Sequence, residues 1–115
     1  MKTDVATLSQ ILERIERIET SGVTRERFLT NPWDQDAVVR NLESIGEAVK
    51  RLSDQSRKQA AGVRWSDIAG FRDLAIHAYD RLDLERTWRI VERELPALKR
   101  AIRSLLSHPS ETTSA

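Results

Sequence analysis

The sequence contains no cysteine, only two histidines and only six aromatic residues among its 115 positions. The absence of cysteine excludes disulfides and thiolate metal sites, and two histidines 31 positions apart, His77 and His108, give no zinc pattern. We therefore expect neither a metal nor another cofactor. The core must consist mostly of Leu, Ile, Val and Ala. A composition of 39% hydrophobic and 32% charged residues is typical of a soluble helical protein rather than of a disordered chain.

Long apolar runs are also missing. No run approaches the roughly 20 residues that span a bilayer, and residues 1–10 lack the apolar core of a signal peptide. We therefore expect a cytoplasmic protein. The net charge is only +1, but the 19 basic residues comprise 15 Arg and 4 Lys. Arginine binds carboxylate or phosphate bidentately, which suits ion-pair networks or phosphate contacts, although solvated helix faces explain most compositions of this kind.

Apolar residues recur every three or four positions along four stretches, which predicts four amphipathic helices. The first covers residues 4–20, with Asp4 as its N-cap and Gly22 just past its end. A short helical turn follows over residues 24–30. The next long helix begins near Asp34 and runs for about 20 residues.

In the second half of the chain, residues 56–64 are polar without an apolar period, which predicts a loop. Ser66 is then a candidate N-cap for a helix over residues 67–81, and Asp83 for the last helix. Pro96 interrupts the last helix and should kink it without ending it.

Four amphipathic helices joined by short links predict an all-α fold, an antiparallel four-helix bundle with the additional short helical turn. The chain length suits one domain with a modest core. We expect residues 1–107 to form this domain and the polar tail, residues 108–115, to be disordered. Trp65 and Trp88 should pack near helix ends or against a neighbouring helix.

Rare side chains gather between residues 70 and 82. On the predicted helix, Arg72, Asp73 and His77 lie opposite the core, with Tyr79 at the core's edge. Asp73 and His77 are four apart, so the carboxylate could orient the imidazole and raise its pKa. Arg72 and His77 are five apart, about 140° around one helix, which is poor geometry for a shared site unless two copies face each other. From spacing alone, an ion-paired arginine, a solvated histidine and a tyrosine at the edge of the core are the simpler interpretation.

The segment R-D-x-x-x-H-x-Y at residues 72–79 resembles the Arg-x4-His-x-Tyr motif of the HepT-like toxins, a branch of the HEPN superfamily of small helical RNA-cleaving proteins. The flanking segments are similar as well: residues 31–52 resemble that family's second long helix, and residues 83–102 its last. The resemblance covers roughly residues 4–106. In one departure, the position after the motif arginine is commonly asparagine there but is Asp73 here, and its charge would repel a phosphate.

This resemblance implies a metal-independent endoribonuclease whose substrate is RNA. His77 would act as the general acid and base, since an ordinary pKa of about 6.5 leaves both of its forms accessible. Arg72 would stabilise charge on phosphate oxygens, and Asp73 would orient the imidazole. With the 2′-hydroxyl of RNA as nucleophile, the expected product is a 2′,3′-cyclic phosphate. We expect a composite site between the two protomers of a homodimer, or within a higher hetero-oligomer.

In the systems that this chain resembles, the partner is a minimal nucleotidyltransferase (MntA-like) antitoxin that transfers AMP to the motif tyrosine, here Tyr79. The added phosphate could capture Arg72 and repel RNA. Trp33 either seals a loop over the core or, if exposed, marks the contact with this antitoxin. Arg40 and Glu47, seven apart, could line the same cleft, although a solvated ion-pair face is commoner.

Two alternatives to the toxin remain open. One is a non-catalytic helical module that binds a nucleotide or a substrate and presents it to the nucleotidyltransferase. The other is a plain helical oligomerisation domain, for which changes at Arg72 or His77 would have effects of only about 0.5 kcal/mol.

Overall fold

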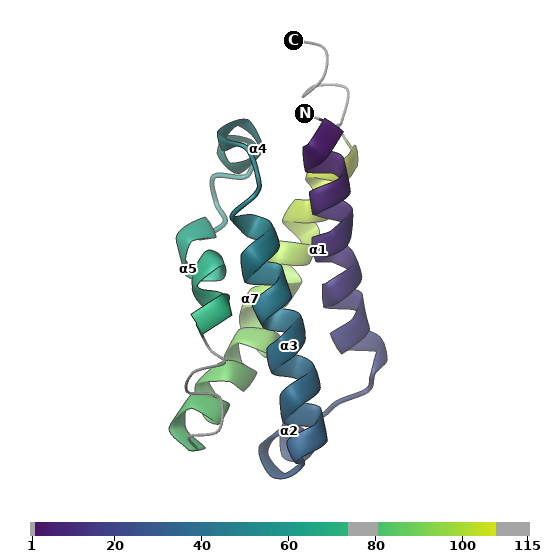
Figure 1. The fold of residues 1–115 in the computed structure, drawn as a ribbon, viewed down its shortest axis with the longest axis vertical. Helices are drawn as coiled ribbons and strands as arrows, with labels where there is room; N and C mark the ends of the chain where they lie inside the picture. The colour runs from purple at the N-terminus through teal and green to yellow at the C-terminus, as the bar shows by residue number, and fades with distance from the viewer. Residues whose placement is uncertain (1, 74–80, 108–115) are drawn as a thin grey trace.

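The computed structural model describes residues 2–73 and 81–107, and this part of the chain contains helices and turns but no strand (Figure 1). The all-α prediction is therefore confirmed. None of the helices described combines the length and the apolarity needed to cross a bilayer. In chain order the elements are α1 (Lys2–Thr20), α2 (Arg25–Thr30), α3 (Pro32–Val49), α4 (Asp54–Gln59), α5 (Trp65–Ala69), the 3₁₀ helix η1 (Gly70–Asp73) and α7 (Arg81–Ser107).

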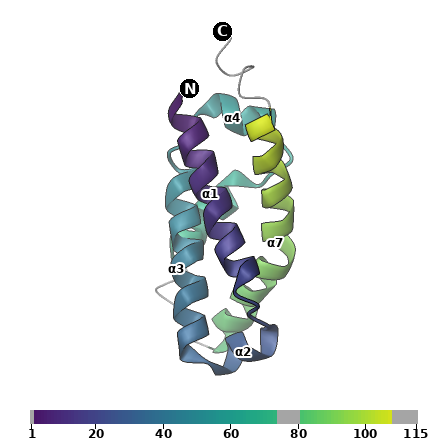
Figure 2. The ribbon, with the colours of Figure 1, turned by 90° about the vertical axis from the view of Figure 1, so that its right-hand side faces the viewer.

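Three long helices, α1, α3 and α7, form the body of the molecule (Figures 1 and 2). The short helices α5 and η1 lie along α3 and together take the place of the fourth helix of the bundle. In Figure 1, α1 runs downward, α3 upward, α5 downward and α7 upward. This alternation is the antiparallel order predicted for the bundle. The predicted tail, residues 108–115, lies outside the residues described, so its disorder and the domain limit at residue 107 stay predictions.

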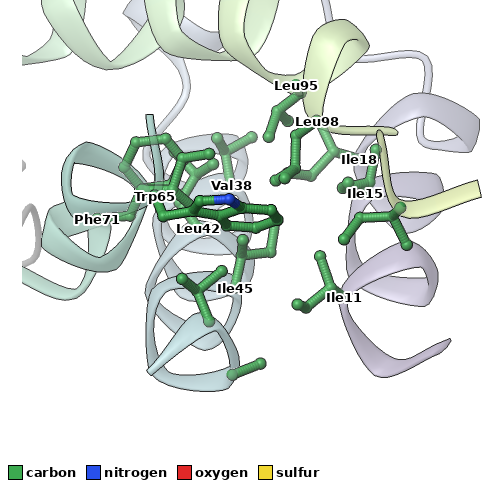
Figure 3. Close-up of a cluster of buried hydrophobic side chains, with 14 of the residues drawn as sticks. Ile11, Ile15, Ile18, Val38, Leu42, Ile45, Trp65, Phe71, Leu95 and Leu98 are labelled. Carbon is green, nitrogen blue, oxygen red and sulfur yellow. The ribbon is translucent and has the colours of Figure 1, made fainter. Parts of the chain in front are cut away.

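A single cluster of buried side chains joins the helices (Figure 3). Trp65 and Phe71 extend this cluster to α5 and η1, with 8% and 4% of their surfaces exposed. The indole N–H of Trp65 also donates to the carbonyls of Arg57 and Ala60, both at 3.1 Å. Burial of Trp65 and Trp88 is as predicted. The centre of the cluster, at most 1% exposed, is formed by Ile11, Ile15, Leu42, Ile45, Leu98 and Ile102.

The first half of the chain follows the predicted elements closely. Gly22, at φ +72°, lies two residues beyond the end of α1 as expected. The short helical turn is α2, capped by Thr24. The next helix begins at Pro32 rather than near Asp34, because Asn31 Oδ1 accepts the first free backbone N–H groups and proline fits the first helical turn.

The side chain at position 33 does not seal the core. Trp33 is 81% exposed, so the prediction that it seals a loop over the core is wrong, and the alternative, that it marks the contact with the antitoxin, stays open. Exposure follows from its place in the first turn of α3, on the side away from the buried residues Leu42 and Ile45.

Asp4 is not an N-cap, because α1 begins at Lys2 and the Asp4 side chain is 3% exposed. Its carboxylate accepts hydrogen bonds from the Ser53 N–H at 3.2 Å, from the Ser53 hydroxyl, and from the Ser56 hydroxyl at 2.7 Å. These contacts tie α1 to α4, a short helix that occupies the first part of the predicted loop. The loop prediction was wrong there because a polar helix of one turn and a half has no apolar period to detect.

The candidate caps Ser66 and Asp83 are also wrong. Helix α5 begins at Trp65, one residue before Ser66, and Arg64 at the N-cap makes no side-chain capping bond. The predicted continuous helix tightens into η1 at residues 70–73, which directs Phe71 into the core. Asp83 lies inside the first turn of α7. As predicted, α7 continues past its internal proline to its end at Ser107.

Candidate functional site

Two of the four predicted site residues, Arg72 and Asp73, lie in η1 beside α3. Their side chains are 45% and 71% exposed, and Arg72 Nε lies 3.7 Å from Asp73 Oδ1. The other two, His77 and Tyr79, fall within residues 74–80 and lie outside the residues described. The described half of the candidate site is therefore an accessible guanidinium with an acidic neighbour.

A second carboxylate reaches the same guanidinium from α3. Glu47 Oε1 lies 3.3 Å from Arg72 Nε, closer than the Asp73 carboxylate, and the Glu47 side chain is 48% exposed. The sequence spacing of seven links Glu47 only with Arg40. The structure instead pairs Glu47 with the motif arginine, 25 positions further along the chain.

Gly46 is the reason that η1 can lie so close to α3. A Cβ built on Gly46 would stand 2.8 Å from the backbone N of Arg72, 3.0 Å from the carbonyl oxygen of Ala69 and 3.1 Å from that of Ile68. Any side chain at position 46 would therefore collide with backbone. Two adjacent residues of α3 thus act together: Gly46 admits the backbone of η1, and Glu47 contacts the Arg72 side chain.

The opposite side of η1 is held from within the core. Phe71 points from η1 into the buried cluster, next to Trp65 of α5 and the apolar side chains of α3 (Figure 3). Truncation of a buried aromatic side chain typically costs about 3–5 kcal/mol, so this anchor is strong. Arg72 is consequently presented at the surface by a short segment whose backbone is fixed on two sides.

The chemistry that these residues supply is stabilisation of an anion. An arginine guanidinium offers five N–H donors in a planar fork that matches phosphate oxygens. Water screens the two half-exposed ion pairs of Arg72, so they do not preclude an incoming phosphate. Among the residues described, no group of three or more His, Asp or Glu side chains could hold a metal ion.

A separate hollow of about 330 Å³ lies between the α4–α5 connection and the C-terminal half of α7. Among the described residues that line it, Gln59 and Ser104 carry polar side chains and none is charged. These residues include no acid or base that could activate the serine hydroxyl, so they offer no catalytic chemistry. The remaining lining residues are Ala60, Gly62, Val63, Ala97, Ala101 and Leu105.

Comparison with known proteins gives matches over most of the chain. A family model described as "Ribonuclease HepT-like" matches residues 9–105, a range that includes α3, α5 and η1. A Thermococcus cleftensis protein named "Probable ribonuclease HepT" is 38% identical over 94 residues, which cover 80% of this chain and 86% of the relative. No solved structure gives a significant match.

Two further relatives carry ribonuclease names. A Caldanaerobacter subterraneus subsp. tengcongensis protein named "Putative RNase" is 37% identical over 110 residues, covering 92% of this chain and 96% of the relative. A Methanocaldococcus jannaschii protein named "Gamma-glutamylcyclotransferase and putative RNase" is 39% identical over 109 residues, 92% of this chain. The chain spans about half the length of this last protein, 49%.

Proposed function

The chain belongs to the family of HepT-like ribonucleases, and from this membership we propose that it is the toxin of a toxin–antitoxin system, a metal-independent endoribonuclease that acts in the cytoplasm. The observation that carries the proposal is the placement of Arg72. Its side chain is 45% exposed on a backbone fixed between α3 and the core, and Arg72 begins the Arg-x4-His-x-Tyr motif.

In the proposed reaction, the Arg72 guanidinium binds the non-bridging oxygens of the scissile phosphate and stabilises the charge that builds on them. Neutral His77 removes the proton from the 2′-hydroxyl, whose oxygen forms a bond to phosphorus while the bond to the 5′-oxygen breaks. The protonated imidazole of His77 then donates a proton to that 5′-oxygen. Asp73, four positions before His77, orients the imidazole. The products are a 2′,3′-cyclic phosphate and a 5′-hydroxyl.

We further propose a composite site between two protomers. The five-residue spacing of Arg72 and His77 separates the two side chains by about 140° on a helix, so one copy alone would present them poorly. In a homodimer whose motif segments face each other, the arginine of one protomer could serve the histidine of the other. Mixing an Arg72→Ala protein with a His77→Ala protein tests this. Recovery of activity in the mixed dimer supports it, and an active monomer contradicts it.

Control of the toxin would act on Tyr79. A nucleotidyltransferase antitoxin that transfers AMP from ATP to the phenol oxygen, with release of pyrophosphate and of the phenol proton, would place a phosphate beside the catalytic groups. That phosphate competes with RNA for Arg72. The adduct is measured as an increase of one AMP in the intact mass, lost in Tyr79→Phe, and it should abolish RNA cleavage.

The deciding experiment measures RNA cleavage in excess EDTA by the parent protein, by Arg72→Ala and by His77→Ala. Circular dichroism at 222 nm must first show equal helicity. We expect both variants to lose at least about a hundredfold in rate. Arg100→Ala is the control, because Arg100 is an exposed arginine of α7 that forms no ion pair with a described residue. It should cut at nearly the parental rate.

The other outcomes are equally informative. Equal cleavage by all four proteins would identify a contaminating nuclease. If the parent does not cut although its intact mass shows Tyr79 unmodified, the non-catalytic binding module becomes the better account. One observation favours that second candidate: Glu47 and Asp73 both flank Arg72, so two carboxylates already oppose its positive charge before any substrate binds.

A further inference from the structure

We propose that Glu47 is a positioning residue of this ribonuclease, holding the Nε edge of Arg72 so that the terminal nitrogens of the guanidinium face the RNA phosphate. This inference rests on the proposed function and adds to it a residue that lies outside the motif, on another helix. Glu47 itself does not touch the RNA; it acts through Arg72.

The geometry of these ion pairs indicates that Glu47 orients the Arg72 guanidinium. A guanidinium carries one N–H on Nε and two on each terminal nitrogen, all in one plane. The nearest atoms of both carboxylates approach the Nε side, Glu47 at 3.3 Å and Asp73 at 3.7 Å. A guanidinium held at that edge keeps its outer fork available, and 45% exposure of the side chain leaves room for a phosphate.

Of the two carboxylates, only that of Glu47 can fix Arg72 relative to the bundle. Asp73 is the next residue in the same 3₁₀ turn, its side chain is 71% exposed, and it moves with Arg72. Glu47 lies in the last turn of the 18-residue helix α3, between the buried residues Ile45 and Val49. A group on a rigid helix holds its partner more accurately than a neighbour in the same short segment does.

The contact between α3 and η1 adds the second constraint. Because Gly46 lets the Arg72 backbone N come within 2.8 Å of a Cβ position on α3, the backbones of residues 46 and 72 have a fixed separation. The side chain of the very next residue, Glu47, then reaches the guanidinium without any adjustment of the fold. The backbone contact with Gly46 thus fixes the start of the Arg72 side chain, and the ion pair with Glu47 fixes the position of its guanidinium.

The opposite role is an inhibitory one. In that case Glu47 pairs with Arg72 in the RNA-free protein, and the RNA phosphate must displace the Glu47 carboxylate before it can bind. The two roles predict opposite kinetics. A positioning carboxylate raises kcat, so its removal lowers kcat, whereas removal of an inhibitory carboxylate raises kcat/KM. Loss of one negative charge near the phosphate should in both cases leave KM unchanged or lower it.

The test compares kcat and KM for RNA cleavage by the parent, Glu47→Gln and Glu47→Asp, with Glu43→Gln as the matched control. Glu43 lies one turn earlier on α3, is half-buried and forms no ion pair with a described residue. We expect kcat to fall about tenfold in Glu47→Gln with KM unchanged or lower, since small misplacements of a catalytic group have effects of this order. Glu47→Asp keeps the charge but loses reach, so it should restore part of the rate. Glu43→Gln should stay within about twofold of the parent.

A readout without RNA separates this inference from the proposed function. The Nε–H signal of Arg72 in a ¹H–¹⁵N spectrum is identified by its loss in Arg72→Lys. We expect it to shift toward the position of free arginines in Glu47→Gln and to stay in place in Glu43→Gln. If the signal does not move, or if an active parent and Glu47→Gln share one kcat, the positioning role is overturned while the ribonuclease stands. If the parent itself never cuts RNA, both fall.

Discussion

Replacement of Gly46 by alanine tests the contact on which the site depends. The added Cβ would lie 2.8 Å from the Arg72 backbone N and 3.0 Å from the Ala69 carbonyl oxygen. Non-bonded heavy atoms normally lie about 3.5–4.0 Å apart. Both neighbours are backbone atoms, so no side-chain rotation can relieve the collision. The chain must therefore move η1 away from α3 by roughly 0.5 Å or more.

Two effects of opposite sign decide the change in stability. Alanine is a better helix former than glycine by about 1 kcal/mol, which favours the Gly46→Ala protein. Overpacking of a filled contact costs about 1–3 kcal/mol. The free energy of unfolding should therefore fall by an amount between zero and about 2 kcal/mol. The effect on activity should be larger, ten- to a hundredfold in kcat, because moving η1 displaces Arg72 from Glu47 and from the substrate.

The assay pairs urea unfolding, followed at 222 nm, with RNA cleavage under conditions where each variant is fully folded. Gly70→Ala is the control: Gly70 begins η1, but a Cβ there meets nothing within 4 Å. Its unfolding free energy should lie within about 0.5 kcal/mol of the parent's and its activity should be kept. A Gly46→Ala protein that gains about 1 kcal/mol and cuts RNA at the parental rate would refute the close packing of η1 on α3.

Three further predictions concern the bundle itself. Burial would raise the pKa of Asp4, but hydrogen bonds from Ser53 and Ser56 outweigh it and hold the pKa below its ordinary value of 3.8. The carboxylate therefore stabilises the fold at pH values above its ordinary pKa of 3.8, and this contribution is lost as the pH falls below 3.8 through the lower pKa of the folded state. The difference in unfolding free energy between the parent and Asp4→Asn should therefore shrink as the pH falls from about 5 to below about 3. A difference independent of pH would contradict these bonds. Trp33→Ala should change the unfolding free energy by less than about 0.5 kcal/mol, because this side chain is 81% exposed; a loss above about 1 kcal/mol would mean that it covers the core after all. Trp65→Ala should cost about 3–5 kcal/mol in urea unfolding, and Trp65→Phe should recover part of that loss unless the site packs loosely.

Local sequence signals predicted the long helices well because each signal acts within a few residues. The apolar period of α1 and α3 identifies which residues face the core, since one helix face must be buried wherever the partner lies. Gly22 was predictable for the same reason, because a left-handed turn at a helix end needs glycine at a particular position.

The errors occurred where a distant residue decided the local structure. Asp4 looks like a cap in the sequence, but α4 lies 50 residues away and turns that carboxylate into a buried acceptor for Ser53 and Ser56. Ser66 has the right chemistry for a cap, yet the burial of Trp65 extends the helix by one residue. Burial and tertiary hydrogen bonds outweigh capping preferences of about 1 kcal/mol.

The sequence by itself determined the all-α fold, the order of its helices and the arginine that opens the motif, because helical periodicity and short motifs are local properties of the chain. It could not predict that Glu47 would meet Arg72 or that Gly46 must be glycine. Those contacts join residues more than 20 positions apart, and their distances depend on how two helical segments pack. Only the tertiary structure decided them, since close packing brings the backbone of η1 against α3 and so places a carboxylate beside the guanidinium.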